Sequence, residues 1–151
     1  MELREDDLTG AEIAAFLAAH LDEMYRITPA ESVHALDLEG LRAPEVTFWS
    51  VWEGDRLVGC GALKEIDSGR GEIKSMRTEP SLRGKGIGSL TLRHITREAI
   101  RRGYASLSLE TGAMAEFAGA RALYERHGFE YCGPFDGYTD DPNSVFMTKR
   151  L

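Results

Sequence analysis

The first third of the chain carries hydrophobic residues at helical spacing. Five apolar side chains three or four positions apart predict an amphipathic helix, namely Ile13, Phe16, Leu17, Leu21 and Met24. Thr9 is the expected N-cap, with Glu12 in the capping-box position, and Pro29 ends the pattern. A second short helix is expected over residues 30–36, and Leu3 marks a short edge strand ahead of both helices.

From residue 46 the hydrophobic pattern takes the spacing of β-strands. Residues 46–52 and 57–66 are rich in β-branched, aromatic and small apolar residues and flank a Glu-Gly-Asp turn, so they predict a hairpin. After a second glycine-containing turn, residues 72–77 are expected to form a third antiparallel strand. Strict alternation would place Ile73, Ser75 and Arg77 on one face and Glu72, Lys74 and Met76 on the other.

Strands and helices alternate in the second half of the chain. A helix that opens at Ile87 and ends at Gly103 leads to a strand over residues 105–111, and a strand, a crossover helix and a second strand imply a parallel pair. The remaining elements are a helix and a closing antiparallel strand pair, expected over residues 118–127, 129–131 and 144–149. The predicted fold is α+β, a single domain over residues 1–151 with a mixed, mostly antiparallel sheet flanked by helices.

A glycine-rich loop between the third strand and its helix suits a phosphate group. Gly84, Gly86 and Gly88 let the backbone approach a ligand, and the N–H groups of the first helical turn have no intrahelical partners. Arg83 and Lys85 add positive charge at the end where the helix dipole is also positive. The glycine spacing matches neither a dinucleotide fingerprint nor a nucleoside-triphosphate loop. What remains is the pattern Arg83-x-x-Gly86-x-Gly88.

This pattern resembles the pyrophosphate loop of the GNAT acetyltransferases, a family that moves an acetyl group from acetyl-coenzyme A to an amine. The resemblance runs from about Val46 to Phe129, and residues 120–129 match a second family motif, A-x-x-L-Y-x-x-x-G-F. It implies acetyl-coenzyme A as co-substrate, and a central parallel strand pair that splays apart in the twisted sheet around the pantetheine arm. The Asn that such sequences often carry before this motif is Phe117 here. The residues implied to bind the cofactor are Met76, Arg77, Thr78, Arg83, Gly84, Lys85, Gly86, Ile87, Gly88 and Ser89.

Transfer to an amine makes chemical demands of its own. An alkylammonium group with a pKa near 10.4 is neutral in only about one molecule in 2,500 at pH 7, so a protein group must remove a proton. Glu72, at the start of the strand that leads into the loop, is the first candidate base, with a surface ion pair as the alternative role, and Glu110 is the second candidate. The resemblance implies that Tyr124 protonates the departing thiolate. A backbone N–H near Met76 or Arg77 would polarise the thioester carbonyl.

Acidic and basic residues are segregated along this chain of net charge −7. Residues 1–55 hold three Arg, no Lys and thirteen acidic residues, a balance of −10, whereas residues 70–102 hold nine basic and three acidic residues, a balance of +6. The basic segment suits the phosphates of coenzyme A, and the overall acidity argues against nucleic acid. The acidic segment favours a cationic acceptor, with solubility alone as the alternative. His34 and Asp37, three positions apart on the second predicted helix, are the candidate substrate contacts.

Further features narrow the function classes. No stretch reaches the roughly 18 apolar residues of a membrane span, which predicts a cytoplasmic protein without a membrane partner. Cys60 and Cys132 lack a C-x-x-C spacing and the histidines show no ligand pattern, so packed thiols and no metal are expected. Both cysteines fall outside the motifs, which favours direct transfer in a ternary complex over an acyl-cysteine route. A non-catalytic acyl-coenzyme A-binding or sensing module remains the alternative function. The acceptor, a small-molecule or peptide amine, and a homodimeric state are left open.

Overall fold

A seven-stranded sheet with the strand order β1-β2-β3-β4-β5-β7-β6 organises the protein. The computed structural model describes all residues 1–151. Neighbouring strands are antiparallel except β4 and β5, which are parallel, so the predicted α+β class and the mixed sheet are confirmed. The strands are β1 Glu2–Glu5, β2 Val46–Glu53, β3 Arg56–Asp67, β4 Arg70–Thr78, β5 Ser106–Gly112, β6 Glu130–Cys132 and β7 Ser144–Arg150.

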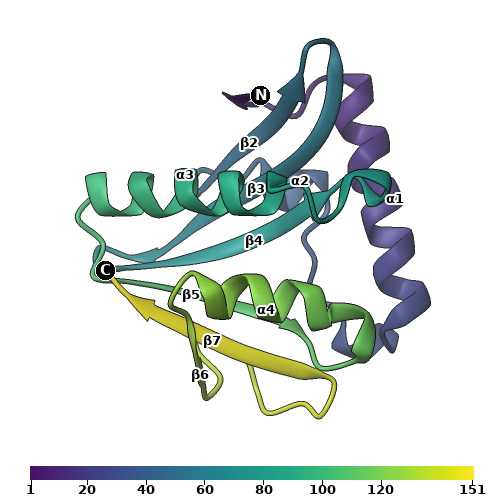
Figure 1. The fold of residues 1–151 in the computed structure, drawn as a ribbon. Helices are drawn as coiled ribbons and strands as arrows, with labels where there is room; N and C mark the ends of the chain where they lie inside the picture. The colour runs from purple at the N-terminus through teal and green to yellow at the C-terminus, as the bar shows by residue number, and fades with distance from the viewer.

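Helices cover both faces of the sheet (Figure 1). One core cluster joins α3 and α4 to the central strands, through Leu92, Ile95 and Tyr124 among others. A second cluster joins α1 and α2 to β2 and β3 on the opposite face, through Ile13 and Leu17 among others. The helices are α1 Ala11–Ile27, α2 Leu38–Leu41, α3 Ile87–Arg101 and α4 Ala118–Arg126, with short 3₁₀ turns η1 Ala30–Ser32, η2 Pro80–Leu82 and η3 Ala115–Phe117. None of the helices is long and apolar enough to cross a membrane.

The expected start of the first helix and the expected second helix were wrong. The N-cap of α1 is Gly10, which has no side chain to cap the helix, and the Thr9 hydroxyl donates to Asp7 at 2.7 Å. Residues 30–36 form only the 3₁₀ turn η1 followed by extended chain, and the second α-helix begins later, at Leu38. Asp37 caps that helix by accepting a 2.8 Å hydrogen bond from the Gly40 backbone N–H.

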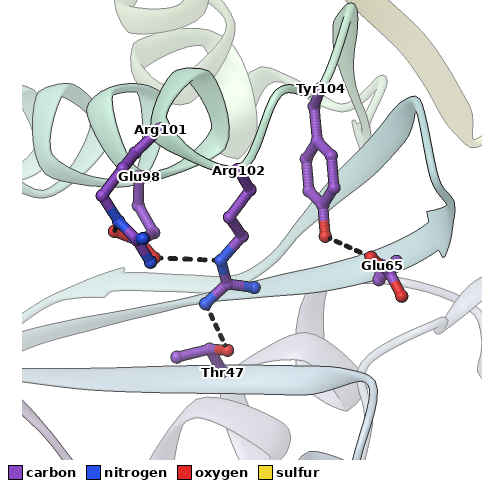
Figure 2. Close-up of polar contacts among 6 residues, drawn as sticks. All are labelled: Thr47, Glu65, Glu98, Arg101, Arg102 and Tyr104. Atoms are coloured by element: carbon purple, nitrogen blue, oxygen red, sulfur yellow. Dashed lines mark hydrogen bonds and ion pairs between the residues drawn. The ribbon is translucent and has the colours of Figure 1, made fainter.

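The C-terminal end of α3 is anchored to the sheet by polar contacts (Figure 2). Arg102 donates to the Glu98 carboxylate at 2.9 Å and to the Thr47 hydroxyl on β2 at 2.8 Å. The hydroxyl of Tyr104, just beyond the helix, donates to Glu65 on β3 at 2.9 Å. These contacts join the C-terminal end of α3 to β2 and β3 on the side of the protein away from the glycine loop.

Candidate functional site

The parallel strands β4 and β5 separate part-way along their length. Their paired positions run from Arg70–Ser106 to Ile73–Leu109 and stop there, although β4 continues to Thr78 and β5 continues to Gly112. Beyond Ile73 the facing edges of β4 and β5 are therefore not paired with each other. This opening lies directly before the glycine loop, as the splayed pair was expected to do.

A β-bulge at Ser75 changes which face the following residues occupy. Ser75 has φ 55, and β4 advances three residues while β3 advances two, between the pairs Ala62–Lys74 and Cys60–Arg77. Strict alternation was therefore the wrong expectation for this strand. Met76 lies on the α3 face with Ile73, while Arg77 turns to the opposite face and contacts α1.

One cavity of about 550 Å³ contains the opening. Its walls come from the end of α1, residues 32–35, the glycine loop, α4 and the segment between β6 and β7. The sequence-predicted residues that line it are Glu72, Glu110, Tyr124, His34, Met76, Arg77, Thr78, Arg83, Gly84, Gly86, Ile87, Gly88 and Ser89. Lys85 is exposed outside this lining, and so is Asp37. The fold thus brings together residues that are separated by as many as 90 positions in the chain (His34 and Tyr124).

The start of α3 has the geometry of an anion site. Gly86 is the N-cap with φ 88 and no side chain caps the helix, so the N–H groups of the first turn are left for a ligand. Gly84 also has positive φ, at 80. A Cβ at Gly88 would lie 3.0 Å from the Leu123 side chain, so a larger residue at this position would crowd α4. An uncapped helix end at the rim of a cavity fits a pyrophosphate group.

Arg83 is tied to α1 as well as to the loop. Its guanidinium lies 3.0 Å from the Glu23 carboxylate, whose other oxygen accepts a 2.8 Å bond from Arg77. Hydrogen bonds from both arginines lower the pKa of Glu23, although burial acts in the opposite direction as the largest single effect. His20 lies beside Arg77, and burial together with that guanidinium lowers the His20 pKa to about 4. The glycine loop and the first helix therefore share one charged network.

Glu72 sits at the base of the opening with its carboxylate almost completely buried. Oε2 accepts a 2.6 Å hydrogen bond from the Tyr138 hydroxyl and lies 3.3 Å from the Lys74 ammonium. Lys74 also donates to Tyr138 at 3.0 Å and to the His34 carbonyl at 3.3 Å. The ion pair that was the alternative role for Glu72 is present, but it is buried and lines the cavity rather than lying on the surface.

Glu110 and Tyr124 face the same cavity from β5 and α4. Burial raises the pKa of the Glu110 carboxyl. Burial also raises the pKa of the Tyr124 hydroxyl, with a further contribution from the Glu110 charge. The Tyr124 ring packs edge-on against Phe129 with centroids 5.9 Å apart, and its hydroxyl has no hydrogen-bond partner in the protein. A protonated hydroxyl that is free to donate can therefore act in this cavity.

The sequence matches the Acetyltransferase (GNAT) family over residues 7–129. The chain belongs to the GNAT acetyltransferase family. An uncharacterised N-acetyltransferase of Bacillus subtilis (strain 168), YsnE, is 58% identical to it over 151 residues, with full coverage of both chains. An IAA acetyltransferase of Azospirillum brasilense is 40% identical, covering 98% of this chain and 95% of the relative. A crystal structure of a Klebsiella pneumoniae acyl-CoA N-acyltransferase superimposes with a TM-score of 0.81 at 31% identity, covering 99% and 97% of the two chains.

Phe117 replaces the Asn that many GNAT sequences carry before the second motif. Its ring lies over Gly112 at the end of β5, where an added Cβ would fall 2.2 Å from the ring. The nearby Arg121 donates to the Gly112 carbonyl at 2.7 Å and to the Met114 carbonyl at 2.9 Å. The packing of the Phe117 ring on Gly112 therefore stabilises the turn between β5 and α4.

Two segments far apart in the chain form the wall of the cavity opposite the glycine loop. The Ser32 hydroxyl donates to Asp141 at 2.6 Å, and the Asn143 amide donates to Ser32 at 3.4 Å. His34 follows Ser32 into the cavity, and its ring contacts Tyr138 edge-on with centroids 5.1 Å apart. His34 and Asp37 are not on one helix face, because η1 ends at Ser32 and α2 begins only at Leu38.

Lys74, Tyr138 and Asn143 are among the polar cavity residues that the sequence did not mark as site residues. Lys74 was predicted as a strand residue, and the signal that could have marked it is its position two residues after Glu72. Tyr138 and Asn143 lie between β6 and β7 in a segment without periodicity. The only available signal there was the length of that segment, since long loops often carry functional residues.

Proposed function

We propose that this GNAT acetyltransferase moves an acetyl group from acetyl-coenzyme A to a primary amine by direct attack in a ternary complex. The observation that carries the proposal is that a single cavity contains the uncapped N-terminus of α3, the carboxylates of Glu72 and Glu110, and a free tyrosine hydroxyl. Phosphate binding, proton removal and proton donation can therefore take place around one opening in the sheet.

The glycine loop supplies the cofactor side. Backbone N–H groups at Ile87, Gly88 and Ser89, which line the cavity, are proposed to hold the pyrophosphate, and the opening between β4 and β5 is proposed to take the pantetheine arm. When bound, acetyl-coenzyme A supplies an acyl group activated as a thioester. A backbone N–H of Met76 or Arg77, on the edge of β4 that has no β5 partner, is proposed to donate to the acyl oxygen.

Glu72 and Tyr124 are proposed to move the two protons. Oε2 of Glu72 is held by Tyr138 and Lys74, which leaves Oε1 to accept a proton from the amine, directly or through water. Glu110 is the second carboxylate in position. Tyr124 is proposed to donate its phenolic proton to the departing thiolate, and its raised pKa keeps that proton in place until then.

Direct transfer is supported by the state of the cysteines. Burial raises the pKa of the Cys60 thiol to about 12, and its sulfur donates to the Ser75 carbonyl at 3.1 Å. Neither Cys60 nor Cys132 lines the cavity. A thiol that is protonated at neutral pH and packed in the core is a poor nucleophile for an acyl-enzyme route.

A cationic acceptor is proposed, but for a different reason from the one the sequence offered. Asp37, the acidic residue expected to contact the acceptor, does not line the cavity. Four glutamates line the cavity, of which Glu72 is paired with Lys74 and Glu23 with Arg77 and Arg83, while Glu110 and Glu116 have no ion-pair partner. We propose that Glu110, whose carboxyl interacts with the Glu72 charge, attracts the ammonium group beside the proposed base.

A thiol-release screen with acetyl-coenzyme A tests the proposal. The acceptors are spermidine, kanamycin, a set of amino acids, a peptide with a free N-terminus, and IAA, the compound named for the Azospirillum brasilense relative. Thiol release with an amine, accompanied by the mass of its acetylated product, is the expected result. Turnover of IAA alone would contradict the amine acceptor. Coenzyme A binding by calorimetry with no release for any acceptor would favour the non-catalytic binding module.

A further inference from the structure

Tyr138 reaches from the segment between β6 and β7 to the middle of the sheet. Its hydroxyl lies 2.6 Å from Oε2 of Glu72 and 3.0 Å from the ammonium of Lys74, so one oxygen contacts both members of the buried ion pair. Its ring packs edge-on against His34 and Phe135, with ring centroids 5.1 Å apart in both pairs. A tilted contact with Phe146, at 5.4 Å between centroids, completes the packing around the ring. The hydroxyl is therefore delivered by a packed aromatic cluster.

The direction of these hydrogen bonds follows from the protonation state of the hydroxyl. Burial and the Glu72 charge raise the pKa of Tyr138, so the phenol keeps its proton. A phenol has one proton to donate, and the carboxylate can only accept it. Lys74 in turn donates to the phenol oxygen, to Glu72 and to the His34 carbonyl, which uses its three protons. The chain of donation runs from Lys74 through Tyr138 to Glu72.

This chain leaves the two carboxylate oxygens of Glu72 in different states. Both donors, Tyr138 and Lys74, contact Oε2, and no protein group donates to Oε1. The only fully buried side-chain polar atoms without a partner are Arg77 Nε and Ser144 Oγ. Oε1 is not among them, although Glu72 as a whole is 2% exposed, so this oxygen keeps a narrow opening, and Glu72 lines the cavity.

We propose that Tyr138 is a positioning residue for the transfer reaction: it holds Oε2 of Glu72 together with Lys74 so that Oε1 faces the acceptor amine. The inference rests on the proposed role of Glu72 as the base. Without the phenol proton, the carboxylate is free to rotate toward Lys74 alone, and the oxygen that meets the amine is no longer fixed. The acceptor site therefore depends on a loop residue whose hydrogen bonds and aromatic contacts involve neither the glycine loop nor Tyr124.

The test compares Tyr138→Phe, Glu72→Gln and a matched control. Phe keeps the ring and its aromatic contacts and removes only the hydroxyl. Tyr104→Phe is the control, because Tyr104 also donates to a glutamate, Glu65, at 2.9 Å, but outside the cavity (Figure 2). The acceptor is the amine with the highest kcat/KM in the screen above. For each variant kcat, acceptor KM, coenzyme A affinity by calorimetry and Tm are measured.

The expected result is a loss confined to the chemical step. Tyr138→Phe should lower kcat roughly ten- to a hundredfold, with Glu72→Gln lower still, within the range of general base catalysis. Coenzyme A affinity should stay within about twofold in both variants, because neither residue belongs to the glycine loop. Tyr104→Phe should keep the kcat of the original protein.

The pH dependence separates positioning of a base from a structural role. At pH 9.5 roughly one alkylamine molecule in ten is already neutral, so proton removal matters less than at pH 7. The deficits of Tyr138→Phe and Glu72→Gln relative to the original protein should therefore narrow together as the pH rises. The ionisable groups that face Glu72 are Lys74 on its own strand, Tyr138 and His34 on the two wall segments, and Glu110 on β5.

Each other outcome overturns the inference in a distinguishable way. A normal kcat for Tyr138→Phe beside a reduced kcat for Glu72→Gln removes Tyr138 from the reaction and leaves the proposed function intact. A normal kcat for Glu72→Gln removes the base that Tyr138 is proposed to hold, while turnover still establishes acetyl transfer. A deficit of Tyr138→Phe that is equal at all pH values and accompanied by weaker coenzyme A binding or a lower Tm would make its role structural.

Discussion

Glu23 of α1 and Arg77 of β4 form an ion pair whose side chains are 15% and 6% exposed, with 2.8 Å between Oε2 and the guanidinium. Because Nε of Arg77 already lacks a partner, Glu23 carries much of the charge compensation of this buried cation. We predict that Glu23→Gln lowers the free energy of unfolding by about 2 kcal/mol, measured by urea denaturation. Glu2→Gln removes an exposed pair with Arg4 and should change it by less than about 0.5 kcal/mol. Equal changes in the free energy of unfolding for the two variants would show that Glu23 is not needed to compensate the buried Arg77 charge.

The glycine loop can be tested by placing a charge in it. Gly86→Asp puts a carboxylate at the N-terminus of α3, where it would repel a phosphate, and it also strains the loop because Gly86 has φ 88. We predict that coenzyme A affinity falls at least about tenfold by calorimetry while the protein stays folded. Gly137→Asp is the control, because Gly137 also has positive φ, at 84, is exposed, has open space around it and lies outside the cavity. Unchanged affinity in a folded Gly86→Asp protein would exclude the loop as the phosphate site.

The proposed role of Tyr124 as the general acid can be tested separately. Tyr124→Phe should lower kcat by roughly ten- to a thousandfold, since only the donated proton is lost. The hydroxyl has no protein partner, so Tm and coenzyme A affinity should be nearly unchanged. Pre-steady-state measurement of thiol release ensures that the chemical step is observed. If the variant releases thiol at the original rate, Tyr124 is a core residue only.

The end of α3 should contribute stability that depends on pH. Hydrogen bonds from Arg101 and then Arg102 lower the pKa of Glu98 from its ordinary 4.5 to about 2. A lowered folded-state pKa means that this contribution is fully present above pH 4.5 and is lost as the pH falls toward 2. We predict that Glu98→Gln is less stable than the original protein at pH 7 and that the difference shrinks below pH 4.5 in denaturant titrations. Glu45→Gln, at an exposed position, should show no such pH-dependent difference.

Much of the fold could be predicted because hydrophobic spacing and glycine turns carry most of the local information. The hairpin predicted over residues 46–52 and 57–66 is β2 and β3 with ends one residue longer. The parallel pair followed from chain order and handedness alone. The cofactor side of the site is local too, since the loop and the start of α3 are adjacent in sequence. Gly84, Gly86 and Gly88 all line the cavity, and their role in cofactor binding stays a prediction.

What could not be predicted depends on tertiary contacts. Nothing in residues 72–78 marks Ser75 as a residue with positive φ, because the bulge is set by pairing with β3 and by the packing of α3 over bare Gly61. Asp37 looks like a helix-face residue in the sequence and is in fact a cap, because the helix begins one position after it. The hydroxyl of Tyr138 finds its partner in Glu72, which lies 66 positions earlier in the chain on β4.

The Ser32–Asp141 hydrogen bond joins positions 109 apart into one wall of the acceptor side. In protein engineering the two segments should therefore be exchanged together. A graft that takes only residues 30–36 from a relative would meet an Asp141 without its hydroxyl partner, and a graft of only the segment between β6 and β7 would leave Ser32 buried and unbonded. Acceptor preference should therefore be exchangeable between members of this family only when both segments are transplanted together, whereas the glycine loop can stay as it is.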